Sequence, residues 1–184
     1  MKKVLYLSLS FEKDIVRHSL LSHFFADLGV YYVSKFPSFP RDVYKILRSD
    51  ETKNYDYILF DTDIKDGVID VTYNFRDSLF EEWEPRRLCL DDIASDIDLP
   101  KSIVICVSAN STSNKMAEVF CKSCAGYVGL NNKLNGFDNS LVLMKLFDYM
   151  INQNKTITDA LNETQKDLPF ASNYTYLGGQ NENK

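Results

Sequence analysis

Short apolar runs and longer amphipathic stretches alternate along this chain. The most informative run is Lys101 to Ser111, in which positions 103–107 are all apolar and mostly β-branched, between Pro100 and a cluster of small polar residues. A short β-branched run bounded by turn formers is typical of a strand that is buried on both faces of a sheet. We therefore expect this run to form the central strand of the fold.

The other periodic stretches predict strands and helices in alternation. Strands are expected over 3–9, 30–35 and 57–60, with amphipathic helices over 14–28 and 41–49 between them. After the central strand we expect a helix over 113–124, a strand over 125–130, a largely buried helix over 138–151, a helix that begins at a capping box at Thr156, and a strand over 173–177. Within 68–85, Val68, Val71 and Tyr73 fit a short hairpin or an edge strand, and the part around Phe80 and Trp83 fits a loop or a helical turn. A short strand at 87–90 and a helix from Asp91 or Asp92 follow.

This order predicts an α/β fold, a three-layer sandwich in which helices cover both faces of a mostly parallel central sheet. The length of 184 residues fits one domain, which we place at 1–179, with a flexible tail at 180–184.

Composition narrows the classes of partner. The net charge is −5, with basic groups interleaved among acidic ones, which argues against a nucleic-acid or anionic-membrane surface. No apolar run is long enough to span a bilayer, and the N-terminal run is too short for a signal peptide. We therefore expect a cytoplasmic protein without a disulfide framework.

The four cysteines are Cys89, Cys106, Cys121 and Cys124. The Cys121–Cys124 pair has no second pair and no histidine to complete a metal site, so helix packing is its expected role. No metal and no cofactor are predicted.

Candidate chemistry lies where strands end, because ligands of open α/β sheets bind beyond the carboxyl ends of the strands. Ser108 to Ser111 follow the central strand, and Asp61 and Asp63 follow the strand over 57–60. The only histidines, His18 and His23, fall on the helix over 14–28. Because neither is near a strand end, both are predicted to be surface imidazoles rather than catalytic bases.

From residue 55 to 179 the chain resembles the caspase-like fold of the CHAT and clostripain-type cysteine peptidases. The resemblance depends on the order of several motifs. Tyr57 to Asp63 stands where the family has a strand that ends in its catalytic His-Gly, and Ile103 to Ser111 stands where it has the nucleophile strand. The flanking segments that also resemble the family are 88–93, 97–100, 125–129, 147–161 and 174–179.

The catalytic pair that this resemblance implies is missing. Ala109 stands at the position of the nucleophilic cysteine, with Asn110 as the nearest alternative alignment, and Asp63 stands at the position of the histidine. Ser108 and Ser111 carry hydroxyls but have no local histidine to activate them. Cys106 lies three residues before Ala109, about 10 Å back along an extended strand, so core packing is its expected role.

Two histories explain this pattern: natural loss of activity, or a peptidase inactivated by replacement of its cysteine at Ala109. A single replacement would not account for Asp63, which favours natural loss. We therefore expect a non-catalytic regulatory or interaction module with a protein partner, for which the sequence sets no oligomeric state. Five aromatic residues fit either an interface with that partner or the core: Tyr31, Tyr32, Phe36, Phe39 and Trp83.

A receiver-like phosphoacceptor domain is the alternative from another functional class. Asp61 or Asp63 would be the acceptor, with Ser108-Ala109 and Lys133 at the ends of later strands. Against it, the first strand ends in Leu7-Ser8-Leu9-Ser10 rather than in the carboxylates that hold Mg²⁺. The 37 residues from Ile64 to Pro100 are also long for one crossover.

Overall fold

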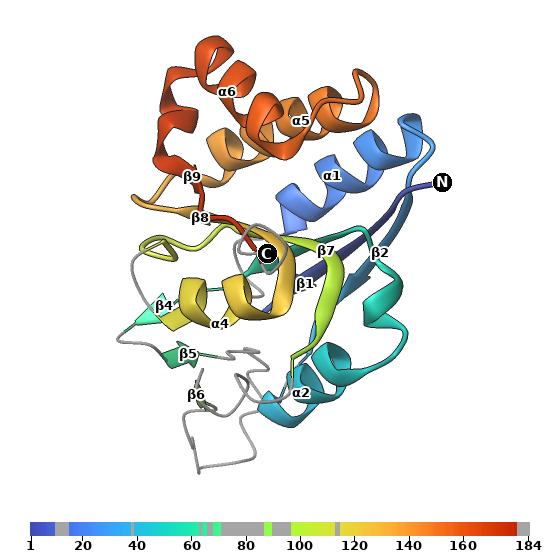
Figure 1. Ribbon diagram of the computed structural model, residues 1–184, viewed down its shortest axis with the longest axis vertical. Helices are drawn as coiled ribbons and strands as arrows, with labels where there is room; N and C mark the ends of the chain where they lie inside the picture. The colour runs from blue at the N-terminus through green and yellow to red at the C-terminus, as the bar shows by residue number, and fades with distance from the viewer. Residues whose placement is uncertain are drawn as a thin grey trace.

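A six-stranded sheet forms the centre of the molecule (Figure 1). The computed structural model describes residues 1–9, 15–37, 39–62, 64–65, 68–70, 87–89, 97–112 and 115–179. The strand order is β2-β1-β3-β7-β8-β9, and only the β8–β9 pair is antiparallel. The strands are β1 (Lys3–Ser8), β2 (Tyr31–Lys35), β3 (Tyr57–Asp61), β7 (Leu99–Cys106), β8 (Cys124–Leu130) and β9 (Tyr174–Tyr176). The predicted central strand is β7, which lies between β3 and β8 as expected.

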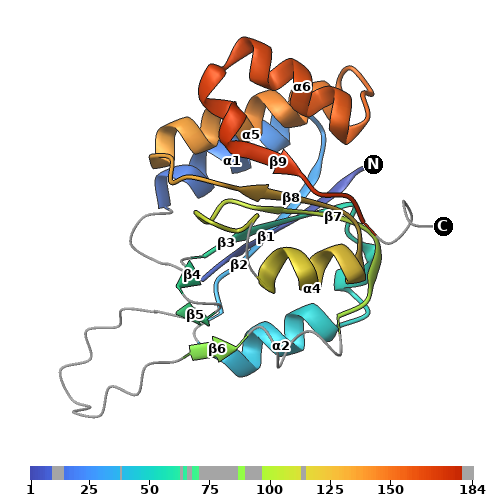
Figure 2. The same ribbon diagram turned by 60° about the vertical axis from the view of Figure 1, so that its left-hand side comes forward.

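Helices cover both faces of this sheet, which confirms the predicted three-layer sandwich (Figure 2). One face is covered by α1 (Ile15–Asp27), α5 (Gly136–Ile151) and α6 (Ile157–Asp167). The other face is covered by α2 (Pro40–Arg48) and α4 (Lys115–Ser123). Short 3₁₀ turns, η1 (Thr52–Asn54) and η2 (Pro169–Asn173), precede β3 and β9. Among the described helices, none is long and apolar enough to cross a bilayer.

Two-sided burial explains why the strands read as unbroken apolar runs. Val4 and Tyr6 of β1 point toward α1 and α5, whereas Leu5 and Leu7 point toward α2 and α4, and all four are fully buried. Because successive side chains of a strand point to opposite faces, both sets must be apolar when both faces are covered. Residues 103–106 of the predicted run follow the same rule in β7.

Local signals end and begin the helices close to where the sequence predicts. Gly29 ends α1 in the left-handed region at φ +65°, and Pro40 opens α2, where its missing N–H costs no helical hydrogen bond. At the start of α6, the Asp159 amide donates to the Thr156 hydroxyl over 3.2 Å, and that hydroxyl donates to the Asp159 carboxylate over 2.8 Å. This confirms Thr156 as the N-cap.

A separate three-stranded antiparallel sheet lies between β3 and β7 in sequence. It consists of β4 (Ile64–Lys65), β5 (Val68–Asp70) and β6 (Arg87–Cys89). Its residues Ile69 and Leu88 are fully buried and join the core on the α2–α4 side. The predicted short strand at 87–90 is confirmed by β6. The helix expected from Asp91 or Asp92 and the tail at 180–184 lie outside the described residues.

Candidate functional site

The tips of β3 and β7 are neighbours at the carboxyl edge of the sheet. Phe60 is paired in register with Cys106, and the Val107 amide donates to the Phe60 carbonyl over 3.1 Å. The tip of β1 joins them, since the Leu9 amide donates to the Asp61 carbonyl over 2.8 Å. The two polar clusters that the sequence singled out therefore meet at one edge. Asp63, the expected counterpart of a catalytic histidine, lies outside the described residues.

The turn that follows β7 holds its polar groups in structural hydrogen bonds. The Ser108 hydroxyl is buried and donates to the Thr62 carbonyl, which ties this turn to the tip of β3. Asn110 is exposed and takes a left-handed backbone conformation, with φ +61°. Its backbone N–H donates to the backbone carbonyl of Asn131 over 2.9 Å. Ala109 is half-buried and adds only a methyl group.

Ser111 joins the same turn to β8. Its side chain is fully buried, and its hydroxyl accepts a hydrogen bond from the Leu130 amide over 2.8 Å. The Tyr127 hydroxyl donates to the Ser111 carbonyl over 2.9 Å. Both serines named by the sequence therefore hold strands together, and the described hydrogen-bond partners of their hydroxyls are backbone groups rather than a base that could activate them for attack.

A buried ion pair occupies the tip of β3 on its other face. Asp61 and Arg17, a residue of α1, are 5% and 6% exposed, and the Arg17 guanidinium donates to the Asp61 carboxylate. The Tyr6 hydroxyl donates to the same carboxylate over 2.6 Å. Sequence reasoning missed Arg17, although its spacing with the buried Leu21 and Phe25 places it on the inward face of α1.

Two further tyrosines extend this polar cluster. Burial raises the pKa of Tyr32, and the negative charge of Asp61 raises it further. Burial likewise raises the pKa of Tyr174, against the opposing effect of the Arg17 charge, and its hydroxyl donates to the Asn139 side chain over 2.8 Å. Both phenols therefore stay protonated at physiological pH and act as hydrogen-bond donors.

His18, predicted to be a surface imidazole, is partly buried against aromatic rings. Its ring stacks on Tyr6 with centroids 6.0 Å apart and lies 5.2 Å from the Phe36 ring. Its Nε2 atom is 3.3 Å from the Ser34 hydroxyl, and burial lowers its pKa. The reason is that α1 packs this residue against β1 and β2. His23 is exposed, as predicted.

The cysteines at these strands are core side chains. Cys106 is fully buried, and burial raises the pKa of its thiol, an effect that hydrogen bonds from Ser108, Ser111 and Tyr127 only partly offset. Cys124 is also buried, and burial raises the pKa of its thiol to about 12. Thiols are nucleophilic as thiolates, so neither is suited to attack a substrate. The packing role predicted for Cys106 and Cys124 is confirmed.

The chemistry open to this edge is limited. In the part of the chain that the structure describes, no three His, Cys, Asp or Glu side chains are grouped so that they could hold a metal ion. No protein-family model matches the chain, and no curated protein matches it. Any function must therefore be argued from the geometry of the molecule itself.

Proposed function

We propose that the chain is a non-catalytic α/β module of caspase-like type that acts through contacts with a protein partner. The observation that supports the proposal is that the polar side chains at the strand tips are engaged in hydrogen bonds within the fold. Asp61 binds Arg17 and Tyr6, and Ser108 and Ser111 bind backbone groups of neighbouring strands. These groups stabilise the edge of the sheet, and none of them forms a nucleophile–base pair with a described residue.

The caspase-like part of the proposal is supported by the adjacency of two tips. A cysteine–histidine pair needs two side chains within hydrogen-bond reach, which the ends of neighbouring parallel strands can supply. The tips after Phe60 and Val107 are such neighbours. Ala109 stands in the turn after β7, where the resemblance requires the nucleophile.

Substitution at Ala109 separates this proposal from that of an inactivated peptidase. The variants Ala109→Cys, Asp63→His and the double variant are incubated with a complex peptide mixture, and new peptide termini are identified by mass spectrometry. The proposal expects no cleavage by Ala109→Cys alone, because the position that the resemblance assigns to the histidine is Asp63 and both histidines of the chain lie on α1. Turnover by Ala109→Cys, lost on alkylation, would instead identify a peptidase that had lost only its cysteine.

The receiver-like alternative has one observation in its favour. The five parallel strands run in the order β2-β1-β3-β7-β8, which is the order of doubly wound receiver domains. The ion pair of Asp61 with Arg17 argues against it, since a phosphoacceptor must be free to approach Mg²⁺. Metal-dependent labelling by acetyl phosphate that is lost in Asp61→Asn would support this alternative.

A further inference from the structure

The outer face of α2 carries an unusual arrangement of charge for an acidic molecule. Arg41, Lys45 and Arg48 are all exposed and follow one another at helical spacing, so they form a single stripe, here called the α2 stripe. The opposite face of the helix buries Val43 and Leu47. The stripe spans about 10 Å along the helix axis.

Elsewhere on the described surface, lysines are commonly paired with carboxylates. Such pairs include Lys2–Asp56, Lys122–Glu118, Lys145–Asp167 and Lys166–Glu163. On α2, Arg41 and Lys45 have no carboxylate within salt-bridge distance among the described residues. The acids that follow the helix are already engaged, Asp50 with Lys53 over 3.2 Å and Glu51 with Lys35 over 3.1 Å.

Aromatic rings hold the guanidinium groups of the stripe in place. The Arg41 group lies 4.9 Å from the centre of the Phe39 ring, and the Arg48 group lies 5.2 Å from that of Tyr44. Stacking of this kind restricts the side chains before any partner arrives, which lowers the entropy lost on binding. Arginine and tyrosine are also enriched where protein interfaces have most of their binding energy.

The stripe leads toward a pocket at the amino edge of the sheet. Because β2 and β3 are parallel, α2 must cross from the carboxyl edge to the amino edge, and Arg48 lies at the end nearest the pocket. The pocket has a volume of about 310 Å³, at the lower end of the range for ligand sites. Its lining residues are Met1, Lys3, Tyr31, Glu51, Asn54 and Tyr55.

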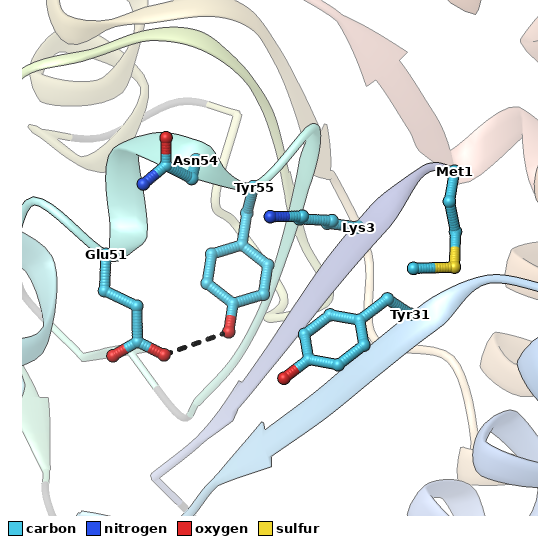
Figure 3. A pocket seen from close by; sticks show the side chains of 6 residues that line it. All are labelled: Met1, Lys3, Tyr31, Glu51, Asn54 and Tyr55. Atoms are coloured by element: carbon cyan, nitrogen blue, oxygen red, sulfur yellow. Dashed lines mark hydrogen bonds between the residues drawn. The ribbon is translucent and has the colours of Figure 1, made fainter.

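This pocket combines aromatic walls with a positive charge. Figure 3 shows Tyr31 and Tyr55 in the wall, with the Lys3 side chain reaching toward Tyr55. The Tyr55 hydroxyl donates to Glu51 over 3.4 Å, and Glu51 is neutralised by Lys35. Tyr31 is 47% exposed and Tyr55 only 3%, so a bound ring would pack mainly against Tyr31. A partner segment with an aromatic side chain between acidic residues fits this pocket, since the aromatic ring would contact Tyr31 and the neighbouring carboxylates would meet Lys3.

We propose that the α2 stripe and this pocket form one docking surface for an acidic segment of a protein partner, with an aromatic side chain of that segment packed against Tyr31. The inference rests on the proposed function and names the class of partner. An acidic protein segment fits better than nucleic acid, because three cations would neutralise few phosphates while the net charge of −5 would repel the rest.

The test uses a fluorescein-labelled peptide of alternating Glu and Asp with one central Tyr, and fluorescence anisotropy as the readout. Arg41→Glu/Lys45→Glu is compared with Lys101→Glu/Lys133→Glu, which changes exposed cations on other elements. Both double variants move the net charge from −5 to −9, so only the position of the charge differs. We expect the α2 variant to weaken binding at least about tenfold and the control variant to stay within about twofold of the unaltered chain.

Tyr31→Ala tests the pocket. It should abolish the difference in affinity between the tyrosine peptide and the same peptide with alanine at that position. No binding by the unaltered chain, or equal weakening by the two double variants, would overturn the proposed surface. Tighter binding of an oligouridylate, or of vesicles rich in phosphatidylserine, would assign the stripe to another kind of partner. None of these outcomes depends on peptide cleavage, so they are distinguishable from a failure of the non-catalytic proposal.

Discussion

Replacing Arg17 by methionine is the perturbation that most directly probes the strand-tip cluster. The change keeps an unbranched side chain of similar length but removes the guanidinium that faces Asp61, whose side chain is 5% exposed. The carboxylate then stays buried without its counter-charge. Breaking a buried ion pair in this way costs about 3–5 kcal/mol, because the remaining charge has lost both water and its partner.

The predicted loss can be measured as a shift of the melting temperature. A chain of this size loses about 2–4 °C per kcal/mol, so Arg17→Met should melt roughly 6–20 °C below the unaltered protein in a circular dichroism scan. The matched control is Lys122→Met, which removes an exposed lysine paired with Glu118 on α4 and should change the melting temperature little.

The double variant Arg17→Met/Asp61→Leu separates the ion pair from simple packing. Because it removes both charges, it should recover most of the stability that Arg17→Met loses. Two results would contradict a stabilising role of the Arg17–Asp61 ion pair. One is a melting temperature of Arg17→Met equal to that of the unaltered protein, and the other is a double variant less stable than both single variants.

Three further predictions concern the same edge of the sheet. Iodoacetamide should modify the exposed Cys89 in the native protein but not the buried Cys106. Raising the pH from about 7 to about 9 should not change this result, since burial raises the pKa of the Cys106 thiol. Detection of alkylated Cys106 by mass spectrometry of the natively labelled protein would contradict the prediction. Gly129→Ala should cost about 1–3 kcal/mol in urea unfolding, because the added Cβ would lie 2.8 Å from the Thr112 methyl and 3.0 Å from its backbone nitrogen. Ser111→Ala should cost about 1–3 kcal/mol by leaving a buried amide of β8 without its acceptor, and an unchanged urea midpoint would argue against that bond.

Much of the fold could be predicted because periodicity and burial are tightly linked in this chain. The apolar run at 103–107 supplies the second half of β7, and Gly29 and Thr156 end and begin helices where their chemistry requires. The meeting of the β3 and β7 tips also followed from sequence, since parallel strands present their carboxyl ends at one edge.

The side-chain partners at that edge could not be predicted in the same way. Arg17 and Asp61 are far apart in sequence, and only the packing of α1 on β1 and β3 brings them together. The contacts of His18 could not be predicted for the same reason, because they come from strands rather than from its own helix. The α2 stripe was not identified from the sequence, because whether Arg41 and Lys45 have a described carboxylate partner depends on where Asp50 and Glu51 point.

Five aromatic residues fitted either the core or an interface, and the structure gives the exposure of four of them. Tyr31 and Phe36 are exposed, whereas Tyr32 and Phe39 are partly buried. Trp83 lies outside the described residues. The exposed Tyr31 and the partly buried Phe39 are the two that the proposed docking surface uses.

The central claim is that the side chains at the tips of β3 and β7 stabilise the sheet and do not catalyse a reaction. Incubation of the unaltered chain with a proteome-derived peptide mixture, followed by mass spectrometry of new termini, tests this most directly. The account predicts the same termini as in buffer alone. New termini that disappear in Ser108→Ala, while that variant keeps its folded circular dichroism spectrum, would contradict it.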